Sequence, residues 1–253
     1  MSAPKKRFGQ HFLTDAGVLA EIAAVCSGVP GEDTVEIGPG RGALTAHLLA
    51  FVPVLHVVEI DRDLIAGLAR RFPPDRVIVH EADALAYPLC RDIPGALRVV
   101  GNLPYNISSP LLFRLLDQQC IRGMAFLLQK EVVERLAAPP GGRDYGRLSV
   151  MVQARCRVTP LFTVAPAAFT PAPRVDSRLV VLEPMAPIVP AAHSARFAAI
   201  VAAAFGQRRK MLRQSLKAYF GEDDWRALGI DARRRPETVS VAEFAALAAY
   251  TPS

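Results

Sequence analysis

The residues whose types and spacing best suit a chemical role are Asn102, Pro104 and Tyr105, which closely follow the apolar run 97–100. An amide, a proline and an aromatic ring in so short a stretch predict a rigid polar loop at the end of a strand. Open α/β sheets bind their substrates at the carboxyl ends of the strands. The stretch 101–106 is therefore the first candidate for a functional site.

This loop has the groups needed to hold an exocyclic amino group for methylation. Transfer of a methyl group from a sulfonium depends on turning the nitrogen lone pair toward the methyl carbon. The side-chain carbonyl of Asn102 and the backbone carbonyl of Leu103 could each accept a hydrogen bond from one N–H of the amino group. Pro104 fixes φ and removes a competing donor. Tyr105 could stack on an unpaired or flipped-out base, and Phe169 could cover the other face. The alternative is a simple turn with Tyr105 in the core, and Phe169 taken alone would more often be a core phenylalanine.

A glycine-rich stretch upstream is typical of a nucleotide site. Gly38, Gly40 and Gly42 lie between a predicted strand and a predicted helix, where glycine lets the backbone pass close to a ligand and the helix supplies free N–H groups. Gly38, Gly40 and Ala43 also satisfy the dinucleotide pattern G-x-G-x-x-A. Glu59 follows Gly40 by 19 residues, close to the spacing of a ribose-binding carboxylate. NAD and an adenosyl sulfonium both remain open.

Asp83 follows the next predicted strand, where its carboxylate could accept a hydrogen bond from an adenine amino group. A helix cap is the alternative interpretation. An adenine contact would suit any adenosyl cofactor, so it does not separate the two candidates. NAD chemistry, however, gives no reason for the amide, proline and tyrosine of the loop at 101–106.

The elements that must position these residues alternate between strand and helix. Helical spacing after a cap at Asp15 predicts one helix before the first strand, and a cap at Ser109 with Pro110 in the first turn predicts another. The alternation predicts βαβ units and a mainly parallel sheet. Strands are expected at 34–37, 54–60, 77–79, 97–100, 124–128, 157–164 and 178–182, with helices at 43–51 and 61–72, and 148–154 fits either state.

A proline cluster at Pro184, Pro187 and Pro190 predicts a linker. It separates two expected domains, 1–184 and 185–253. The second is predicted to be entirely helical, and its last helix begins at the capping box of Ser240 and Glu243. Its other helices are expected at 195–205, 208–220 and 225–228.

The distribution of charge indicates a polyanionic partner. The net charge is +6, yet residues 1–150 hold 16 Lys/Arg and 16 Asp/Glu, whereas residues 151–253 hold 14 and 8. A basic half beside a neutral half favours nucleic acid. The predicted helix 208–220 would carry Arg209, Arg213 and Lys217 on one face. The candidate phosphate contacts are Arg208, Arg209, Lys210, Arg213 and Lys217.

The cysteines and the hydropathy exclude several classes of protein. Cys26, Cys90, Cys120 and Cys156 are widely spaced and form no C-x-x-C pair, so we expect four separate buried thiols and neither a metal site nor a disulfide framework. No apolar stretch approaches the ~20 residues that cross a bilayer, and no signal peptide is evident. A cytoplasmic protein without a membrane partner is expected.

Seven segments, in order, closely resemble the rRNA adenine N6,N6-dimethyltransferases of the small-subunit branch. They lie at 8–13, 35–45, 58–63, 81–83, 101–109, 129–132 and 205–210. Leu103 and the basic stretch 207–210 favour this branch over relatives that methylate large-subunit rRNA. Departures from the family pattern occur at Ala165, Arg174, Met211 and Gln214.

The resemblance implies a Rossmann-like class I methyltransferase fold with a small helical C-terminal domain that meets rRNA. The implied reaction is dimethylation of two adjacent adenosines near the 3′ end of 16S rRNA, within a pre-ribosomal particle, by a monomer that needs no metal. Asn102, Leu103, Pro104, Tyr105 and Phe169 are the implied catalytic residues. S-adenosylmethionine would be contacted by Gln10, His11, Leu13, Gly38, Gly40, Glu59, Ile60, Asp83, Ala84 and Asn102.

Two other functions remain open from the sequence. The chain could be an rRNA-binding assembly factor in which catalysis is secondary, or it could methylate adenine in large-subunit (23S) rRNA. NAD-linked oxidoreduction is a further alternative, which predicts affinity for NADH.

Overall fold

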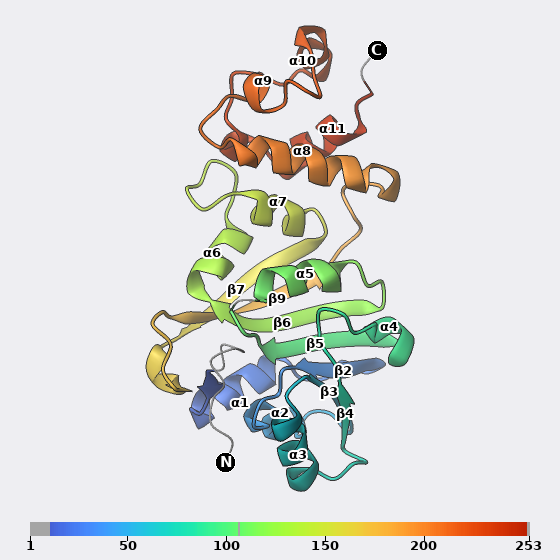
Figure 1. Ribbon diagram of the computed structural model, residues 1–253, viewed down its shortest axis with the longest axis vertical. Coiled ribbons are helices and arrows are strands. Elements are labelled where there is room, and N and C mark those ends of the chain that lie inside the picture. The colour runs from blue at the N-terminus through green and yellow to red at the C-terminus, as the bar shows by residue number, and fades with distance from the viewer. Residues whose placement is uncertain (1–10, 106, 252–253) are drawn as a thin grey trace. The chain divides into compact units, whose positions relative to one another are not determined.

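The computed structural model describes residues 11–105 and 107–251 and divides the chain into two compact units (Figure 1). The first unit holds the residues up to 133 together with 159–184, and the second holds 134–158 and 185–253. The boundary near Pro184 agrees with the proline cluster. The prediction that 134–158 belongs to the first domain is wrong, because Ala138, Tyr145 and Val150 pack into the hydrophobic core of the second unit.

The first unit is built on a seven-stranded sheet with the order β4-β3-β2-β5-β6-β9-β7. Neighbouring strands from β4 to β6 run parallel, and β9 is antiparallel to β6. The predicted, mainly parallel sheet is therefore confirmed. The strands are β2 (Glu32–Ile37), β3 (Leu55–Glu59), β4 (Val77–Glu81), β5 (Ala96–Asn102), β6 (Ile121–Gln129), β7 (Cys156–Val164) and β9 (Ser177–Pro184).

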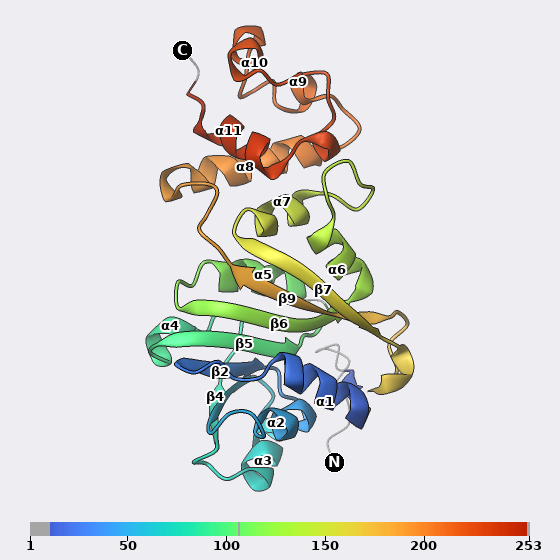
Figure 2. The ribbon, with the colours of Figure 1, turned by 180° about the vertical axis from the view of Figure 1, so that it is seen from behind.

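Helices cover both faces of this sheet: α5 lies in front of it in Figure 1, and α1 lies in front in the opposite view of Figure 2. Asp15 caps α1 with its side chain, as predicted, and Asp61 caps α3 in the same way. Ser109 is not a cap, because α5 already begins at Ser108. The helices are α1 (Ala16–Val25), α2 (Ala43–Leu48), α3 (Arg62–Arg71), α4 (Leu89–Asp92), α5 (Ser108–Leu116) and α6 (Lys130–Ala137).

The central strands are buried because their sequences are nearly continuous runs of β-branched and aliphatic residues, as expected for a sheet covered on both sides. Val35, Val57 and Val99 are each fully buried. The strand ends therefore cannot shift in register without exposing apolar side chains. The polar groups that follow each strand are fixed relative to one another by this pairing.

Two short strands join distant parts of the first unit. β1 (Phe12–Leu13) pairs antiparallel with β8 (Phe169–Thr170), so that Leu13 lies opposite Phe169. Residues 1–10 lie outside the described part of the chain. The pairing ties the segment before α1 to the proline-rich stretch 166–173, which precedes β9.

The second unit is helical, as predicted, but its basic segment differs from the prediction. α8 ends at Gly206, and residues 207–211 form a turn before the short α9 (Leu212–Ser215). The backbone N–H groups of Leu212 and Arg213 donate to carbonyls of Arg234 and Ala232 instead of continuing a helix. The other helices are α7 (Arg147–Gln153), α8 (Ser194–Gly206), α10 (Glu222–Leu228) and α11 (Val241–Ala249).

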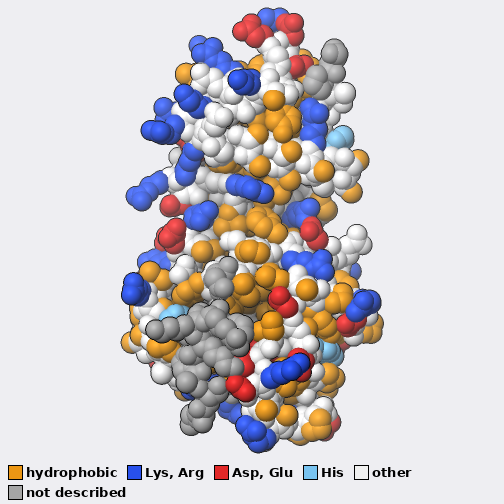
Figure 3. Space-filling view, viewed as in Figure 1, with side chains coloured by type: hydrophobic (Ala, Val, Ile, Leu, Met, Phe, Trp, Pro, Cys, Tyr) orange, Lys and Arg blue, Asp and Glu red, His pale blue; other side chains and the backbone are white. Residues whose placement is uncertain are grey.

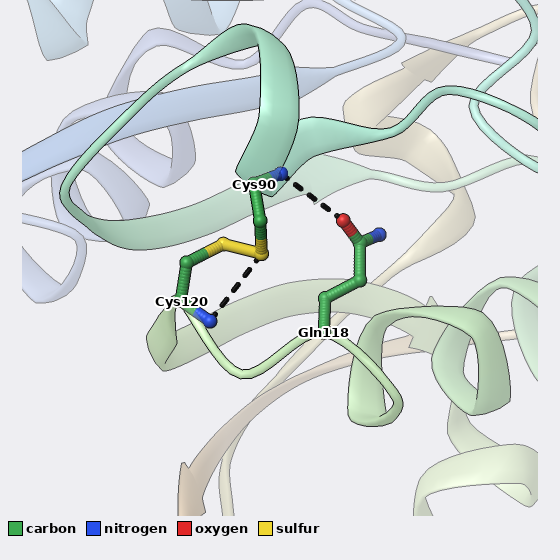
Figure 4. The surroundings of a disulfide bond; sticks show 3 residues. All are labelled: Cys90, Gln118 and Cys120. Carbon is green, nitrogen blue, oxygen red and sulfur yellow. Dashed lines mark hydrogen bonds between the residues drawn. A yellow bond between two sulfur atoms is a disulfide. The ribbon is translucent and has the colours of Figure 1, made fainter.

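One cysteine prediction is also wrong. Cys90 in α4 and Cys120, which directly precedes β6, form a disulfide, and the side-chain carbonyl of Gln118 accepts a hydrogen bond from the N–H of Cys90 (Figure 4). The two cysteines are 30 positions apart in the sequence, and the fold brings them together. Cys26 and Cys156 are free and buried, as expected.

Within the described residues, no helix is long and apolar enough to span a bilayer. The same part of the chain contains no cluster of three or more His, Cys, Asp or Glu residues suited to a metal ion.

Candidate active site

The candidate site lies where the carboxyl ends of four neighbouring parallel strands meet. β2 and β3 end at Ile37 and Glu59, and β5 ends at Asn102. The chain passes from β2 to β3 and β4 on one side and places β5 on the other, so the strand order reverses at β2. Such a reversal opens a crevice beyond the strand ends, and this is where open α/β sheets bind ligands.

The glycine turn after β2 takes a conformation that other residues rarely adopt. Gly38, Gly40 and Gly42 have φ values of 65°, 58° and 75°. A Cβ atom on Gly42 would lie 2.6 Å from the ring of Phe72, so close packing requires glycine there. At Gly38 a Cβ would meet nothing within 4 Å, because this backbone borders open space. The turn thus exposes its backbone to a ligand.

A buried hydrogen bond fixes this turn from below. The hydroxyl of Thr45, in the first turn of α2, donates to Oε2 of Glu36 on β2 at 2.6 Å. Glu36 is 1% exposed. Burial raises the pKa of its carboxyl to about 7, and the neighbouring Glu59 adds to the rise while the Thr45 bond opposes it. The pair joins the end of the strand to the start of the helix on both sides of the glycines.

Glu59 ends β3 with a carboxylate that the backbone orients. Its Oε1 accepts hydrogen bonds from the N–H groups of Ile60 and Asp61, both at 2.9 Å. Burial raises its pKa, and these backbone bonds oppose the rise. The N–H of Gly40 also hydrogen-bonds to this carboxylate, which has more acceptor positions than these three bonds use. Glu59 can therefore still accept a hydrogen bond from a hydroxyl group in the crevice.

The edge of the crevice beside β4 combines a carboxylate with apolar surface. Oδ1 of Asp83 accepts a hydrogen bond from the N–H of Leu85 at 2.9 Å, and the side chain is exposed. Ile60 is 49% exposed and lines the cavity. Together they offer an acceptor for an amino group and an apolar face for a ring.

The amide of Asn102 is oriented by the segment before α1. Its Nδ2 donates to the backbone carbonyl of His11 at 3.0 Å. This bond fixes the orientation of the amide, and the side-chain oxygen Oδ1, which is the acceptor of the group, can accept from a substrate. The imidazole of His11 is itself held at 2.8 Å from the carbonyl oxygen of Pro171.

Tyr105 is held by two contacts. Its hydroxyl lies 2.8 Å from Oγ of Ser177, and its ring stacks on that of His11 with centroids 5.8 Å apart and planes inclined by 25°. The side chain is half-buried. Ser177 was not predicted from the sequence, because a lone serine at the start of a strand carries no chemical signal.

A cavity of about 480 Å³ collects these groups, and it lies entirely within the first unit. The predicted residues that line it are His11, Leu13, Gly38, Gly40, Glu59, Ile60, Asp83, Ala84, Asn102, Leu103, Pro104 and Tyr105. Gln10 lies outside the described residues. Sequence reasoning missed Arg41, which also lines the cavity and places its guanidinium 4.4 Å from the ring centre of Phe12.

The position of Phe169 differs from its predicted place over the target base. Its side chain is 3% exposed and belongs to the hydrophobic core together with Leu13 and Val164, and it does not line the cavity. The pairing of β1 with β8 places it there. In this structure Phe169 packs the core beneath the site and does not present a face to a base.

The predicted phosphate contacts are all exposed on the second unit, although not on a single helix. Arg208, Arg209 and Lys210 lie in the turn before α9, Arg213 lies in α9, and Lys217 follows it. Figure 3 shows Lys and Arg side chains gathered over this part of the second unit. The positive surface is retained, whereas the predicted i, i+4, i+8 geometry is not.

Comparison with solved structures defines the class of fold. A dimethyladenosine transferase from Plasmodium falciparum matches with a TM-score of 0.77 at 25% identity, covering 94% of this chain and 96% of that one. The 23S rRNA methyltransferase ErmE matches with a TM-score of 0.75 at 24% identity, covering 94% and 98%. The fold is therefore the Rossmann-like fold of methyltransferases.

The sequence comparisons narrow this class. The family model described as ribosomal RNA adenine dimethylase matches residues 1–252. Ribosomal RNA small subunit methyltransferase A of Laribacter hongkongensis is 52% identical, covering 96% of this chain and 94% of the relative. Its counterpart from Thiobacillus denitrificans is 51% identical, covering 99% and 98%. The chain belongs to the ribosomal RNA adenine dimethylase family.

Proposed function

We propose that this protein uses S-adenosylmethionine to dimethylate N6 of two adjacent adenosines near the 3′ end of small-subunit (16S) rRNA during assembly of the subunit. The observation that carries the proposal is the anchored amide of Asn102 at the end of β5, beside a nucleotide-type crevice. The sequence is 52% and 51% identical to two small-subunit rRNA methyltransferases over nearly its full length, which supports the choice of substrate. The protein acts as a monomer in the cytoplasm, where the pre-ribosomal particle is assembled.

The crevice fits an adenosyl cofactor. The open backbone at Gly38 leaves room beside the glycine turn, and Glu59 presents a backbone-oriented carboxylate for the ribose hydroxyls. Asp83 can accept from the adenine amino group while Ile60 packs against the ring. When bound, S-adenosylmethionine supplies an electrophilic methyl group on a sulfonium. NAD fits the glycines equally well but leaves the Asn102 loop without a task.

The loop orients the amine rather than deprotonating it. Oδ1 of Asn102 accepts one N–H bond of the adenine amino group, and the carbonyl of Leu103 accepts the other, so that the nitrogen lone pair turns toward the cofactor side of the cavity. Leu103 itself is buried, which fixes the backbone of the loop. No separate base is needed, because the amine loses its proton readily once it is alkylated.

The target base must leave its stack to reach this loop. Tyr105 offers an aromatic ring at the cavity wall, and stacking on such a ring is how proteins hold an extruded or single-stranded base. The exposed cations between Arg208 and Lys217 would bind rRNA phosphates and keep the protein on its particle.

Methyl transfer by the purified protein tests the proposal. Small and large subunits isolated from cells that lack the corresponding methylase would be incubated with labelled S-adenosylmethionine. We expect label in N6,N6-dimethyladenosine of the small-subunit rRNA and none in the large subunit. Label in the large subunit, or in neither, would contradict the proposed substrate.

The Asn102→Ala variant tests the role of the loop in the same assay. We expect cofactor binding to persist, because the other cofactor contacts remain, and transfer to fall by about 100-fold, the scale of loss when reacting atoms are misplaced. A titration of the wild-type protein with NADH should show no binding, which would exclude NAD-linked oxidoreduction. Unimpaired transfer by Asn102→Ala would exclude the mechanism.

A further inference from the structure

We propose that Ser177 is a positioning residue for methyl transfer, acting by holding the hydroxyl end of Tyr105 so that the ring is set for the target base. The inference rests on the proposed function and extends it to a residue outside the cavity. Ser177 reaches the reaction only through Tyr105.

The contact is a part-buried hydrogen bond in which the serine is the buried partner. The two hydroxyl oxygens lie 2.8 Å apart, and Ser177 is 0% exposed. A buried hydroxyl without a partner is destabilising, and buried polar groups are accordingly almost always paired. Burial also raises the pKa of Tyr105, so the phenol keeps its proton and can donate in this bond.

The two partners differ in how firmly the backbone holds them. Ser177 opens β9 and lies opposite Gln129 of β6 in an antiparallel pair, so its position is set by the sheet. Tyr105 lies in the turn between β5 and α5. The hydrogen bond therefore holds the side chain of Tyr105, in the loop, against a residue whose position the sheet fixes.

A second contact restrains the same ring from another side. The His11 ring lies against Tyr105, and Pro171 in turn holds the imidazole. Stacking alone limits the tilt of the Tyr105 ring but leaves it able to slide, whereas the bond to Ser177 fixes the far end. Loss of that bond should allow the ring to leave the orientation on which the base stacks.

The double-mutant cycle of Ser177→Ala and Tyr105→Phe tests this role. Each single variant should lower kcat for undermethylated small subunits by about fivefold, the scale of one hydrogen bond between neutral groups. The double variant should be no slower than either single one, because both remove the same bond. The Kd for S-adenosylmethionine and the KM for the particle should stay unchanged.

The control is Ser194→Ala, which removes a serine hydroxyl at the start of α8 in the second unit and should leave kcat unchanged. Wild-type kcat in Ser177→Ala or in Tyr105→Phe would overturn the inference. A roughly 25-fold loss in the double variant, as expected for independent effects, would do the same. Tyr105→Phe keeps the test valid if Ser177→Ala folds poorly.

A crystal structure of the Ser177→Ala variant gives a readout that does not depend on activity. We expect the Tyr105 ring to shift or to occupy two positions, and an unchanged single position would overturn the inference. A wild-type protein that methylates no adenine would instead contradict the proposed function and leave this structural readout in force.

Discussion

The Thr45 hydroxyl donates a 2.6 Å hydrogen bond to the Glu36 carboxyl, joining β2 to α2 beneath the glycine turn. Glu36 is nearly inaccessible to water, and desolvation favours its neutral form. The turn that borders the cavity therefore rests on an acid that exchanges its proton near neutral pH. This relationship makes the stability of the site depend on pH.

The first prediction concerns that dependence. Burial raises the pKa of Glu36 from 4.5 to about 7, so between these pH values the folded state keeps a proton that the unfolded chain releases. The contribution of Glu36 to the free energy of unfolding should fall by about 3 kcal/mol as pH rises from 4.5 to 7, and should then level off. Urea unfolding at several pH values would measure it.

Glu36→Gln is the matched variant for this measurement, because it retains an acceptor for Thr45 but cannot ionise. The free energy of unfolding of Glu36→Gln, relative to that of the wild type, should increase as pH rises to 7. Glu59 is also raised in pKa and remains in both proteins, so only its coupling to Glu36 differs between them. Stability curves that run parallel from pH 5 to 8 would refute the assignment.

A second prediction concerns Gly101, which precedes Asn102. A Cβ atom there would lie 2.5 Å from the backbone oxygen of Ile37, and a backbone atom cannot move aside cheaply. Gly101→Ala should lower the free energy of unfolding by about 1–3 kcal/mol, as overpacking does, and should impair transfer by displacing Asn102. Denaturant unfolding measures the first effect.

Gly67→Ala is the control for Gly101→Ala. Gly67 lies within α3, and a Cβ there would meet nothing within 4 Å. This substitution should stabilise the protein by about 0.5–1 kcal/mol through helix propensity. Equal effects of the two substitutions would show that the close approach of β2 and β5 at Gly101 does not matter.

A third prediction concerns the disulfide between Cys90 and Cys120. It closes a loop of about 30 residues, for which the chain-entropy model gives about 3–4 kcal/mol of stabilisation. Reducing agent should lower the stability of the wild type by this scale and leave Cys90→Ser/Cys120→Ser unaffected. Titration of the unreduced, denatured protein should find two thiols, Cys26 and Cys156, and a count of four would contradict the bond.

A fourth prediction concerns the exposed cations of the second unit. Arg209→Glu with Arg213→Glu should weaken binding to the small subunit and reduce the slope of log K against log salt by about two. Charge reversal at Arg70 and Arg91, which are exposed on the first unit, changes the net charge equally. Equal weakening by both pairs would show that only net charge matters.

The sheet and most of the cavity could be predicted because apolar strand runs and helical patterns alternate along the sequence. Once the strands are placed, parallel pairing brings their carboxyl ends together, and the polar residues that follow must meet. Glu59, Asp83 and Asn102 were found in this way, and all three line the cavity. Their binding roles stay predictions.

The remaining features depend on contacts between residues that are distant in sequence. The two-residue strands β1 and β8 are too short to show periodicity, so the pairing that buries Phe169 and the anchoring of Asn102 by His11 could not be foreseen. The helix expected at 208–220 fails because the 232–234 segment binds the N–H groups of Leu212 and Arg213. Tertiary hydrogen bonds override local helical spacing there.

Mapping of N6,N6-dimethyladenosine in rRNA from cells with and without this protein tests the central claim most directly. We expect two adjacent dimethyladenosines near the 3′ end of small-subunit rRNA that disappear when the protein is removed and return with the wild-type chain but not with Asn102→Ala. An unchanged pattern after removal, or a loss confined to large-subunit rRNA, would contradict it.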